Sequence, residues 1–206
     1  MPPCAIPPDL LTRLDDTPDA AFYRPTRLVT HLDAPGLAAL TAFYAQQLTT
    51  GQDLLDLMSS WVSHLPPGLA LGHVAGLGMN GPELAANPRL TERVVHDLNA
   101  DSRLPWPDAR FDAVLNALSV QYLTRPLEVY AEVARVLRPD GIAIIAHSNR
   151  CFATKAVRAF RDYPPADRLR LCRHYLDQTG AFGPVQQVDH TPPHGDPLWI
   201  VFARHR

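Results

Sequence analysis

The sequence predicts an α/β protein built on a doubly wound sheet. From residue 54 onward, short apolar runs alternate with amphipathic ones, a pattern typical of parallel strands connected by helices. Most of the first five runs are continuously apolar, which indicates strands buried on both faces. The expected strands are residues 54–58, 73–77, 94–98, 111–118, 142–147, 185–189 and 198–203.

Residues 126–137 have the clearest helical pattern, because their apolar side chains recur at helical spacing. Pro126 suits the first turn of this helix. Residues 138–141, Arg-Pro-Asp-Gly, are expected to end it and turn the chain into the next strand. A further helix is expected at residues 168–179, stopped by Gly180.

The first 50 residues differ from the rest. Their ends are rich in proline, and residues 37–48 form an amphipathic stretch. We expect a helical cap over residues 1–50, covering the carboxyl edge of a core at residues 51–206. A chain of 206 residues suits one domain with a single core.

Composition narrows the functional classes. The net charge of −2 argues against nucleic acid as a partner. The apolar runs are too short to span a bilayer, and the N-terminus does not resemble a secretory signal, so we expect a cytoplasmic protein. Cys4, Cys151 and Cys172 show no metal or redox spacing and are expected to be free thiols. His190, His194 and Asp196 make a weak metal motif, so no metal is expected. The sequence does not indicate an oligomeric state.

One long motif resembles a known family. Residues 104–114, LPWPDARFDAV, are followed by Tyr122-Leu123 and by EVARVLRPDG at residues 132–141. This run resembles the LPF-x-D-x-x-FD-x-V … RVL-(R/K)-PGG segment of class I methyltransferases of the type 11 kind. The resemblance implies a Rossmann-like sheet of seven strands in the order 3-2-1-4-5-7-6, with strand 7 antiparallel. It also implies methyl transfer from S-adenosylmethionine, and we expect a small-molecule acceptor.

The resemblance implies a cofactor loop after the first strand. Asp56 is the acid that ends this strand, and residues 58–64, MSSWVSH, replace the glycine-rich loop of the family. Glycine belongs in such loops because the backbone approaches the cofactor closely. Here we expect the hydroxyl groups of Ser59 and Ser60 to reach the donor's carboxylate or to cap a following helix, with Trp61 beside the ligand.

The remaining cofactor contacts are implied by position. Gly78 stands where the family has the acid that holds the ribose, and Asn80 is the nearest polar substitute. Asp97 is the expected partner of the adenine amino group, beside Leu98, and Asn116 lies at the same edge.

The acceptor pocket is expected between this edge and the cap. His31, oriented by Asp33, is the preferred general base, because an imidazole titrates near neutral pH. His147 is a reserve candidate. The expected substrate-contacting residues are Tyr23, Arg27, Tyr122 and His147.

Two other functions remain open. Loss of the loop glycines and of the ribose acid also fits a catalytically inactive, methyltransferase-like binding or regulatory protein. Gly76-x-Gly78-x-x-Gly81, with Asp97 downstream, has the form of a dinucleotide fingerprint. It would predict an NAD-binding oxidoreductase, but Pro82 and Pro88 leave little room for the helix that such a motif requires.

Overall fold

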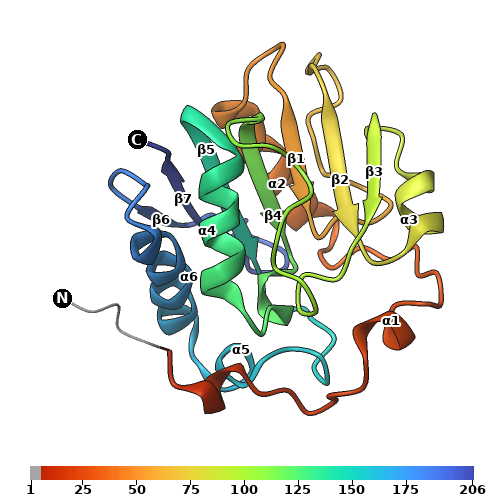
Figure 1. Ribbon diagram of the computed structural model, residues 1–206, viewed down its shortest axis with the longest axis vertical. Coiled ribbons are helices and arrows are strands. Elements are labelled where there is room, and N and C mark those ends of the chain that lie inside the picture. Colours follow the sequence, from red (N-terminus) through yellow and green to blue (C-terminus); the bar gives the residue numbers. More distant parts are fainter. Residues whose placement is uncertain (1–5) are drawn as a thin grey trace.

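The computed structural model describes residues 6–206. It contains a seven-stranded sheet in the order β3-β2-β1-β4-β5-β7-β6, in which β7 runs antiparallel to β5 and β6 and the other pairs are parallel (Figure 1). The predicted fold class and strand order are therefore confirmed. The strands are β1 (Leu54–Leu57), β2 (Val74–Gly78), β3 (Glu92–Val95), β4 (Phe111–Ala117), β5 (Leu137–His147), β6 (Gln186–Asp189) and β7 (Trp199–Arg204).

Helices cover both faces of the sheet, and α4 and α6 lie side by side on one of them (Figure 1). The helix α6 ends where predicted, because Gly180 adopts a left-handed conformation with φ of 68°. The helices are α1 (Asp19–Phe22), α2 (Ala34–Gln47), α3 (Gly81–Ala86), α4 (Pro126–Val136), α5 (Arg158–Asp162) and α6 (Pro165–Thr179), with short 3-10 turns at Pro8–Leu11 and Val120–Tyr122.

The core has two layers because successive strand residues point to opposite faces. Leu55 and Val114 pack with the side of the sheet covered by α4 and α6. Leu54 and Leu115 face the other layer, which includes Leu40 of α2. The continuous apolar runs therefore mark strands buried on both faces, as predicted.

The start of β5 differs from the prediction. The turn expected at residues 138–141 lies inside β5, where the pairing with β4 changes register between Phe111 and Ala113. Asp140 takes a φ of 62° there. The strand therefore begins at Leu137 and accommodates the turn residues as a bulge.

The connection between β1 and β2 also differs. Residues 58–73 form no helix, so the expectation that Ser59 and Ser60 cap a following helix is wrong. Pro66, Pro67 and Gly68 disfavour a helix in this segment. The adjoining sheet face is covered instead by α2, whose Thr41 hydroxyl donates to the carbonyl oxygen of His64 at 3.0 Å.

Residues 6–50 divide into two parts. Residues 6–33 run along the carboxyl edge of the sheet, whereas α2 lies against one of its faces (Figure 1). We retain the division into an N-terminal part and a sheet core within one domain as a proposal. Within residues 6–206, no helix is both long and apolar enough to cross a membrane. Cys151 and Cys172 are free thiols, and Cys4 lies outside the described residues.

Candidate functional site

A pocket lies beyond the carboxyl ends of β1, β2 and β4. Its walls come from the loops after these strands and from the N-terminal segment, which we define as residues 13–31. The cavity has a volume of about 130 Å³, less than the roughly 300–1,000 Å³ typical of small-molecule sites.

The loop after β1 is organised around a buried carboxylate. One oxygen of Asp56 accepts hydrogen bonds from the hydroxyl groups of Ser59 and Ser63, each at 2.6 Å. Burial raises the pKa of Asp56 to about 6, and these hydrogen bonds oppose the shift. Met58 has a φ of 58°, the left-handed conformation for which glycine is the ordinary choice. The loop therefore has a backbone bend of the kind that glycine favours, although its sequence contains no glycine.

Gly78, at the end of β2, lies directly beneath this loop. A Cβ atom at this position would lie 2.2 Å from the carbonyl oxygen of Ser59. No side chain fits there, so the ribose-binding acid of related enzymes is excluded sterically from this position. The close approach of the two backbones takes up the space that an acid would need.

Asn80 was expected to replace that acid, but its amide is already engaged. Its oxygen accepts from the backbone N–H of Glu83 at 3.0 Å and caps α3. Its nitrogen donates to the carbonyl oxygens of Tyr23 at 2.9 Å and Arg24 at 3.1 Å. Asn80 therefore fastens the N-terminal segment to the end of β2.

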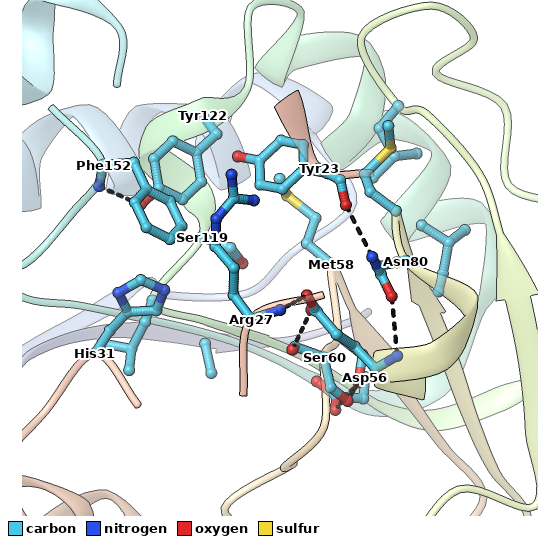
Figure 2. Close-up of a pocket in the computed structure, with 18 of the residues that line it drawn as sticks. Tyr23, Arg27, His31, Asp56, Met58, Ser60, Asn80, Ser119, Tyr122 and Phe152 are labelled. Atoms are coloured by element: carbon cyan, nitrogen blue, oxygen red, sulfur yellow. Dashed lines mark hydrogen bonds between the residues drawn. The ribbon is translucent and has the colours of Figure 1, made fainter. Parts of the chain in front are cut away.

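Glu83 is a pocket residue that the sequence reasoning missed. One carboxylate oxygen accepts from the Ser60 hydroxyl at 2.6 Å and the other from the backbone N–H of Arg27 at 2.7 Å (Figure 2). A sequence signal existed, because Asn80 and Glu83 are spaced as the N-cap and N3 residues of a capping box. The structure turns the carboxylate toward the pocket instead of back to the cap.

Asp97 and Leu98 follow β3 and line the pocket. One oxygen of Asp97 accepts from the backbone N–H groups of Asn99 at 2.9 Å and Ala100 at 3.3 Å. Asn116, by contrast, lies below the pocket wall. Its amide donates to the Leu57 carbonyl oxygen at 3.2 Å and to the Ser119 hydroxyl at 3.1 Å, so Asn116 braces the strand ends and Ser119 forms the surface.

Trp61 also lies outside the pocket wall. Its indole N–H donates to the carbonyl oxygen of Val29 at 2.8 Å. This bond fixes the loop after β1 to the N-terminal segment. Trp61 therefore joins two segments of the chain by a hydrogen bond, whereas the sequence reasoning expected it to contact the ligand.

Aromatic side chains form the other end of the pocket. The hydroxyl of Tyr122 accepts from the backbone N–H of Phe152 at 2.8 Å, and their rings stack with centroids 6.1 Å apart. The ring of His31 meets Phe152 edge-on at 4.9 Å. Figure 2 shows Tyr23 and Arg27 extending into the same region. Phe152 was not anticipated from the sequence, because it follows no recognisable motif.

The predicted pairing of His31 with Asp33 is not present. Both oxygens of Asp33 accept from backbone N–H groups, those of Gly36 at 2.9 Å and Asp196 at 3.0 Å, so Asp33 caps α2. Burial and the nearby charge of Arg150 lower the pKa of His31. His31 therefore remains a neutral imidazole at the pocket wall, without Asp33 as its orienting group.

His147 is buried away from the pocket wall. It is fully buried at the end of β5, between Phe160 and Trp199, and neither ring nitrogen has a hydrogen-bond partner in the described part of the chain. Burial lowers its pKa to about 3. The structure does not bring His147 to the substrate side, where the sequence reasoning expected it.

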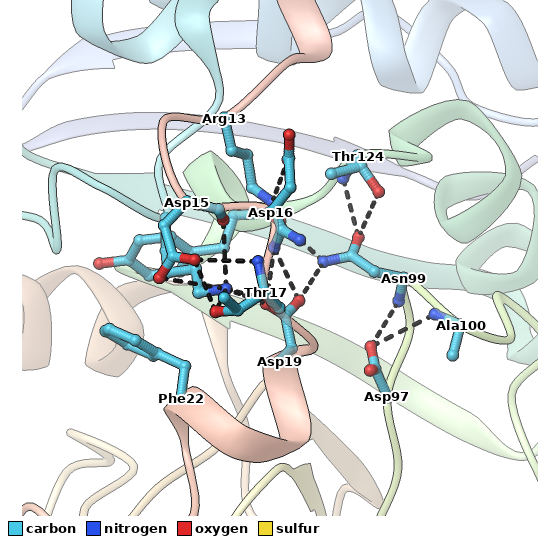
Figure 3. Close-up of polar contacts among 12 residues, drawn as sticks. Arg13, Asp15, Asp16, Thr17, Asp19, Phe22, Asp97, Asn99, Ala100 and Thr124 are labelled. Atoms are coloured by element: carbon cyan, nitrogen blue, oxygen red, sulfur yellow. Dashed lines mark hydrogen bonds and ion pairs between the residues drawn. The ribbon is translucent and has the colours of Figure 1, made fainter.

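A buried charge cluster anchors the N-terminal segment. Asp19 pairs with Arg13 at 2.7 Å and with Lys155 at 3.2 Å, and it accepts from the Asn99 amide at 2.8 Å (Figure 3). Lys155 is the only lysine in the chain and is fully buried. Its ammonium group also donates to the carbonyl oxygen of Thr17 at 2.5 Å. The compact ammonium fits this cage of oxygen atoms, which a planar guanidinium would not.

The fold is that of the class I methyltransferases, and the pocket lies where the strand order reverses between β1 and β4. Residues 61–145 match the family described as "Methyltransferase domain". The chain therefore contains a methyltransferase domain segment and has the fold of S-adenosylmethionine-dependent methyltransferases, and this confirms the resemblance seen in the sequence. The matched segment begins within the atypical loop and covers less than half of the chain. No curated protein matches the sequence.

Solved structures share the fold at low sequence identity. An S-adenosylmethionine-dependent methyltransferase from Mesorhizobium loti is 16% identical with a TM-score of 0.58, over 82% of this chain and 100% of that one. A phosphoethanolamine N-methyltransferase 2 from Haemonchus contortus, in complex with S-adenosyl-L-methionine, is 15% identical with a TM-score of 0.58, over 82% of this chain and 52% of that one. The [4+2]-cyclase SpnF is 17% identical with a TM-score of 0.58, over 81% and 80% of the two chains.

Proposed function

We propose that this protein transfers a methyl group from S-adenosylmethionine to a small-molecule acceptor. The observation that carries the proposal is the pocket at the switch point of the sheet, with Asp56, Glu83 and Asp97 on its β1–β3 side. In open α/β sheets, ligands bind at this point. The domain match supports S-adenosylmethionine as the cofactor.

The pocket residues fit a nucleoside donor. Asp97 keeps one carboxylate oxygen on the backbone of its own loop, and its other oxygen is proposed to accept from the adenine amino group, beside the apolar surface of Leu98. Glu83 is proposed to take the ribose hydroxyl groups, because its carboxylate already accepts from one hydroxyl, that of Ser60. Ser59 and Asp56 hold the loop between these groups.

The cofactor supplies an activated methyl group on a sulfonium centre. The work left to the chain is to align the acceptor and exclude water. The N-terminal segment covers the pocket, which supports an acceptor small enough to be enclosed. His31 is proposed to receive a proton from the acceptor, because its lowered pKa keeps the ring unprotonated at neutral pH.

Binding measurements test this proposal. Thermal-shift and calorimetric titrations with S-adenosylmethionine, S-adenosylhomocysteine and NAD should show stabilisation by the first two only, since a ligand selective for the native state raises its melting temperature. Asp97→Ala should weaken both, whereas the exposed Asp101→Ala should not. If neither compound binds the parent protein, the proposal fails.

A catalytically inactive binding protein is the second candidate. It is favoured by the absence of glycine from the loop after β1 and by the closed position at Gly78, which depart from the usual cofactor loop. S-adenosylhomocysteine binding without methyl transfer to any of a broad panel of acceptors would support it. The NAD alternative is weakened by the same geometry, because the Ser59 carbonyl oxygen occupies the space next to Gly78 where a pyrophosphate would approach.

A further inference from the structure

The guanidinium group of Arg27 is a pocket cation without a carboxylate partner. Its Nη1 donates only to backbone carbonyl oxygens, those of Phe22 at 2.9 Å and Pro25 at 3.4 Å. Its central carbon lies 4.7 Å from the ring centroid of Phe22 and 5.7 Å from that of Phe152. No acidic side chain among residues 6–206 pairs with this group. Since a guanidinium carries five N–H donors, donors remain for a ligand.

The Tyr23 hydroxyl is a second unused donor at the same place. It is buried and has no hydrogen-bond partner among residues 6–206, and burial raises the pKa of the Tyr23 phenol, so the hydroxyl keeps the proton that it can donate. Figure 2 shows this hydroxyl and the guanidinium pointing into the same part of the pocket. Buried polar groups are normally hydrogen-bonded, so this pair indicates a missing acceptor.

The charge distribution specifies what kind of acceptor is missing. The acids Asp56, Glu83 and Asp97 line the β1–β3 side of the pocket, whereas Arg27 lies at the end walled by Tyr122 and Phe152. Asp19 also lines the pocket, but its charge is balanced by ion pairs with Arg13 and Lys155. A hydrogen-bond acceptor with negative charge matches the guanidinium and the hydroxyl together. A carboxylate fits best, because it can take two parallel N–H donors from an arginine as well as one O–H donor.

We propose that Arg27 and Tyr23 form a carboxylate-binding site within the pocket. The inference rests on the proposed function for its ligand, because the carboxylate has two possible sources. One is the amino-acid end of the methyl donor. The other is an acceptor with a carboxylate and a flat apolar body, which the rings of Tyr122 and Phe152 would contact.

Calorimetry with three probes tests the site and identifies the source. S-adenosylhomocysteine carries nucleoside and carboxylate, 5′-methylthioadenosine carries the nucleoside thioether alone, and benzoate is a small aromatic carboxylate. Each is titrated into the parent protein, Arg27→Gln, Arg27→Lys and Tyr23→Phe. Arg24→Gln is the matched control, because Arg24 is an exposed cation on the same segment.

Two patterns support the proposal. If Arg27→Gln lowers the affinity for S-adenosylhomocysteine by about tenfold or more and leaves the affinity for methylthioadenosine unchanged, the methyl donor supplies the carboxylate. If Arg27→Gln leaves the affinity for both nucleosides unchanged and abolishes benzoate binding, the methyl acceptor supplies the carboxylate. In either case Tyr23→Phe should cause a smaller loss in the same titration, Arg27→Lys should fall between parent and Arg27→Gln, and Arg24→Gln should match the parent.

Other patterns overturn it. If Arg27→Gln lowers the affinity for both nucleosides equally, Arg27 only shapes the pocket wall. If Arg27→Gln binds S-adenosylhomocysteine and benzoate as the parent does, Arg27 binds no carboxylate. If neither nucleoside binds the parent, the proposed function fails, and the benzoate titrations still decide the carboxylate site. Binding of none of the three probes to the parent would overturn both.

Discussion

The carbonyl oxygen of Ser59 occupies the space in which Gly78 would carry a side chain, 2.2 Å from the position of a Cβ atom. The backbone N–H of Ser59 also donates to the carbonyl oxygen of Leu77 at 2.7 Å. The loop after β1 and the end of β2 are therefore packed backbone against backbone. Position 78 consequently admits no side chain unless the loop after β1 shifts.

Gly78→Ala should destabilise the fold and abolish ligand binding. The added methyl group meets backbone that cannot rotate away, so the loop must shift, at a cost of about 1–3 kcal/mol. Gly78→Asp, which introduces the acid that related enzymes place here, should also destabilise the fold and abolish ligand binding. Denaturant unfolding and titration with S-adenosylhomocysteine measure both effects. Gly68→Ala is the control, because none of residues 6–206 places an atom within 4 Å of its added methyl group. Parent-like binding in Gly78→Ala would contradict the packing described.

Glu83→Gln should lower the affinity for both S-adenosylhomocysteine and methylthioadenosine by about tenfold. The reason is that loss of the negative charge weakens the proposed hydrogen bonds to the ribose hydroxyl groups. Both probes contain this ribose, so the pattern differs from either supporting pattern expected for Arg27→Gln. The exposed Glu128→Gln is the control. An unchanged affinity for both nucleosides would remove Glu83 from the cofactor site.

Lys155→Met should loosen the N-terminal segment. It removes the ammonium that donates to the Thr17 carbonyl and pairs with Asp19, and unsatisfied buried acceptors cost about 1–3 kcal/mol. Faster hydrogen exchange at residues 13–31 should accompany the loss of stability. Arg158→Met, which removes an exposed cation nearby, should have little effect. Exchange at the parent rate in Lys155→Met would show that the segment is held by other contacts.

His147→Phe should make the protein less sensitive to acid. Burial lowers the folded-state pKa of His147 to about 3 from an ordinary value of 6.5, so the unfolded chain takes up a proton that the folded protein does not. The contribution of His147 to the free energy of unfolding is therefore fully present above pH 6.5 and decreases as the pH falls toward 3. At pH 5 the free energy of unfolding is lower by about 2 kcal/mol because of this group.

Denaturant unfolding of the parent and His147→Phe between pH 5 and pH 7.5 measures this difference directly. Phenylalanine suits the site because its neighbours are the rings of Phe160 and Trp199. His194 is exposed, so His194→Phe should show the same pH dependence of stability as the parent. Parallel pH profiles for His147→Phe and the parent would mean that His147 is solvated or paired in solution.

Local pattern was enough to predict the sheet, because continuous apolar runs indicate burial on both faces and the motif from Leu104 to Gly141 resembles a family with this fold. It was also enough to place Asp56 and Asp97 at the ends of their strands. The site beyond these residues depends on distant contacts. Glu83 joins the pocket only because Ser60 and Arg27 come to it from two other segments. Trp61 and Asn116 were expected at the ligand, but they lie outside the pocket wall and bind backbone groups that the sequence does not place beside them. Asn80 lines the pocket, and its amide also binds backbone groups of the N-terminal segment.

The position of α2 has a consequence for how the chain reaches its native state. Phe43 of this helix packs against Phe202 of β7, with ring centroids 5.3 Å apart, although the two residues lie far apart in the sequence. Contacts between residues so distant in sequence are slow to form. The part of the apolar side of α2 that meets β7 therefore stays exposed until β7 joins the sheet, and we expect this docking to be a late step of folding.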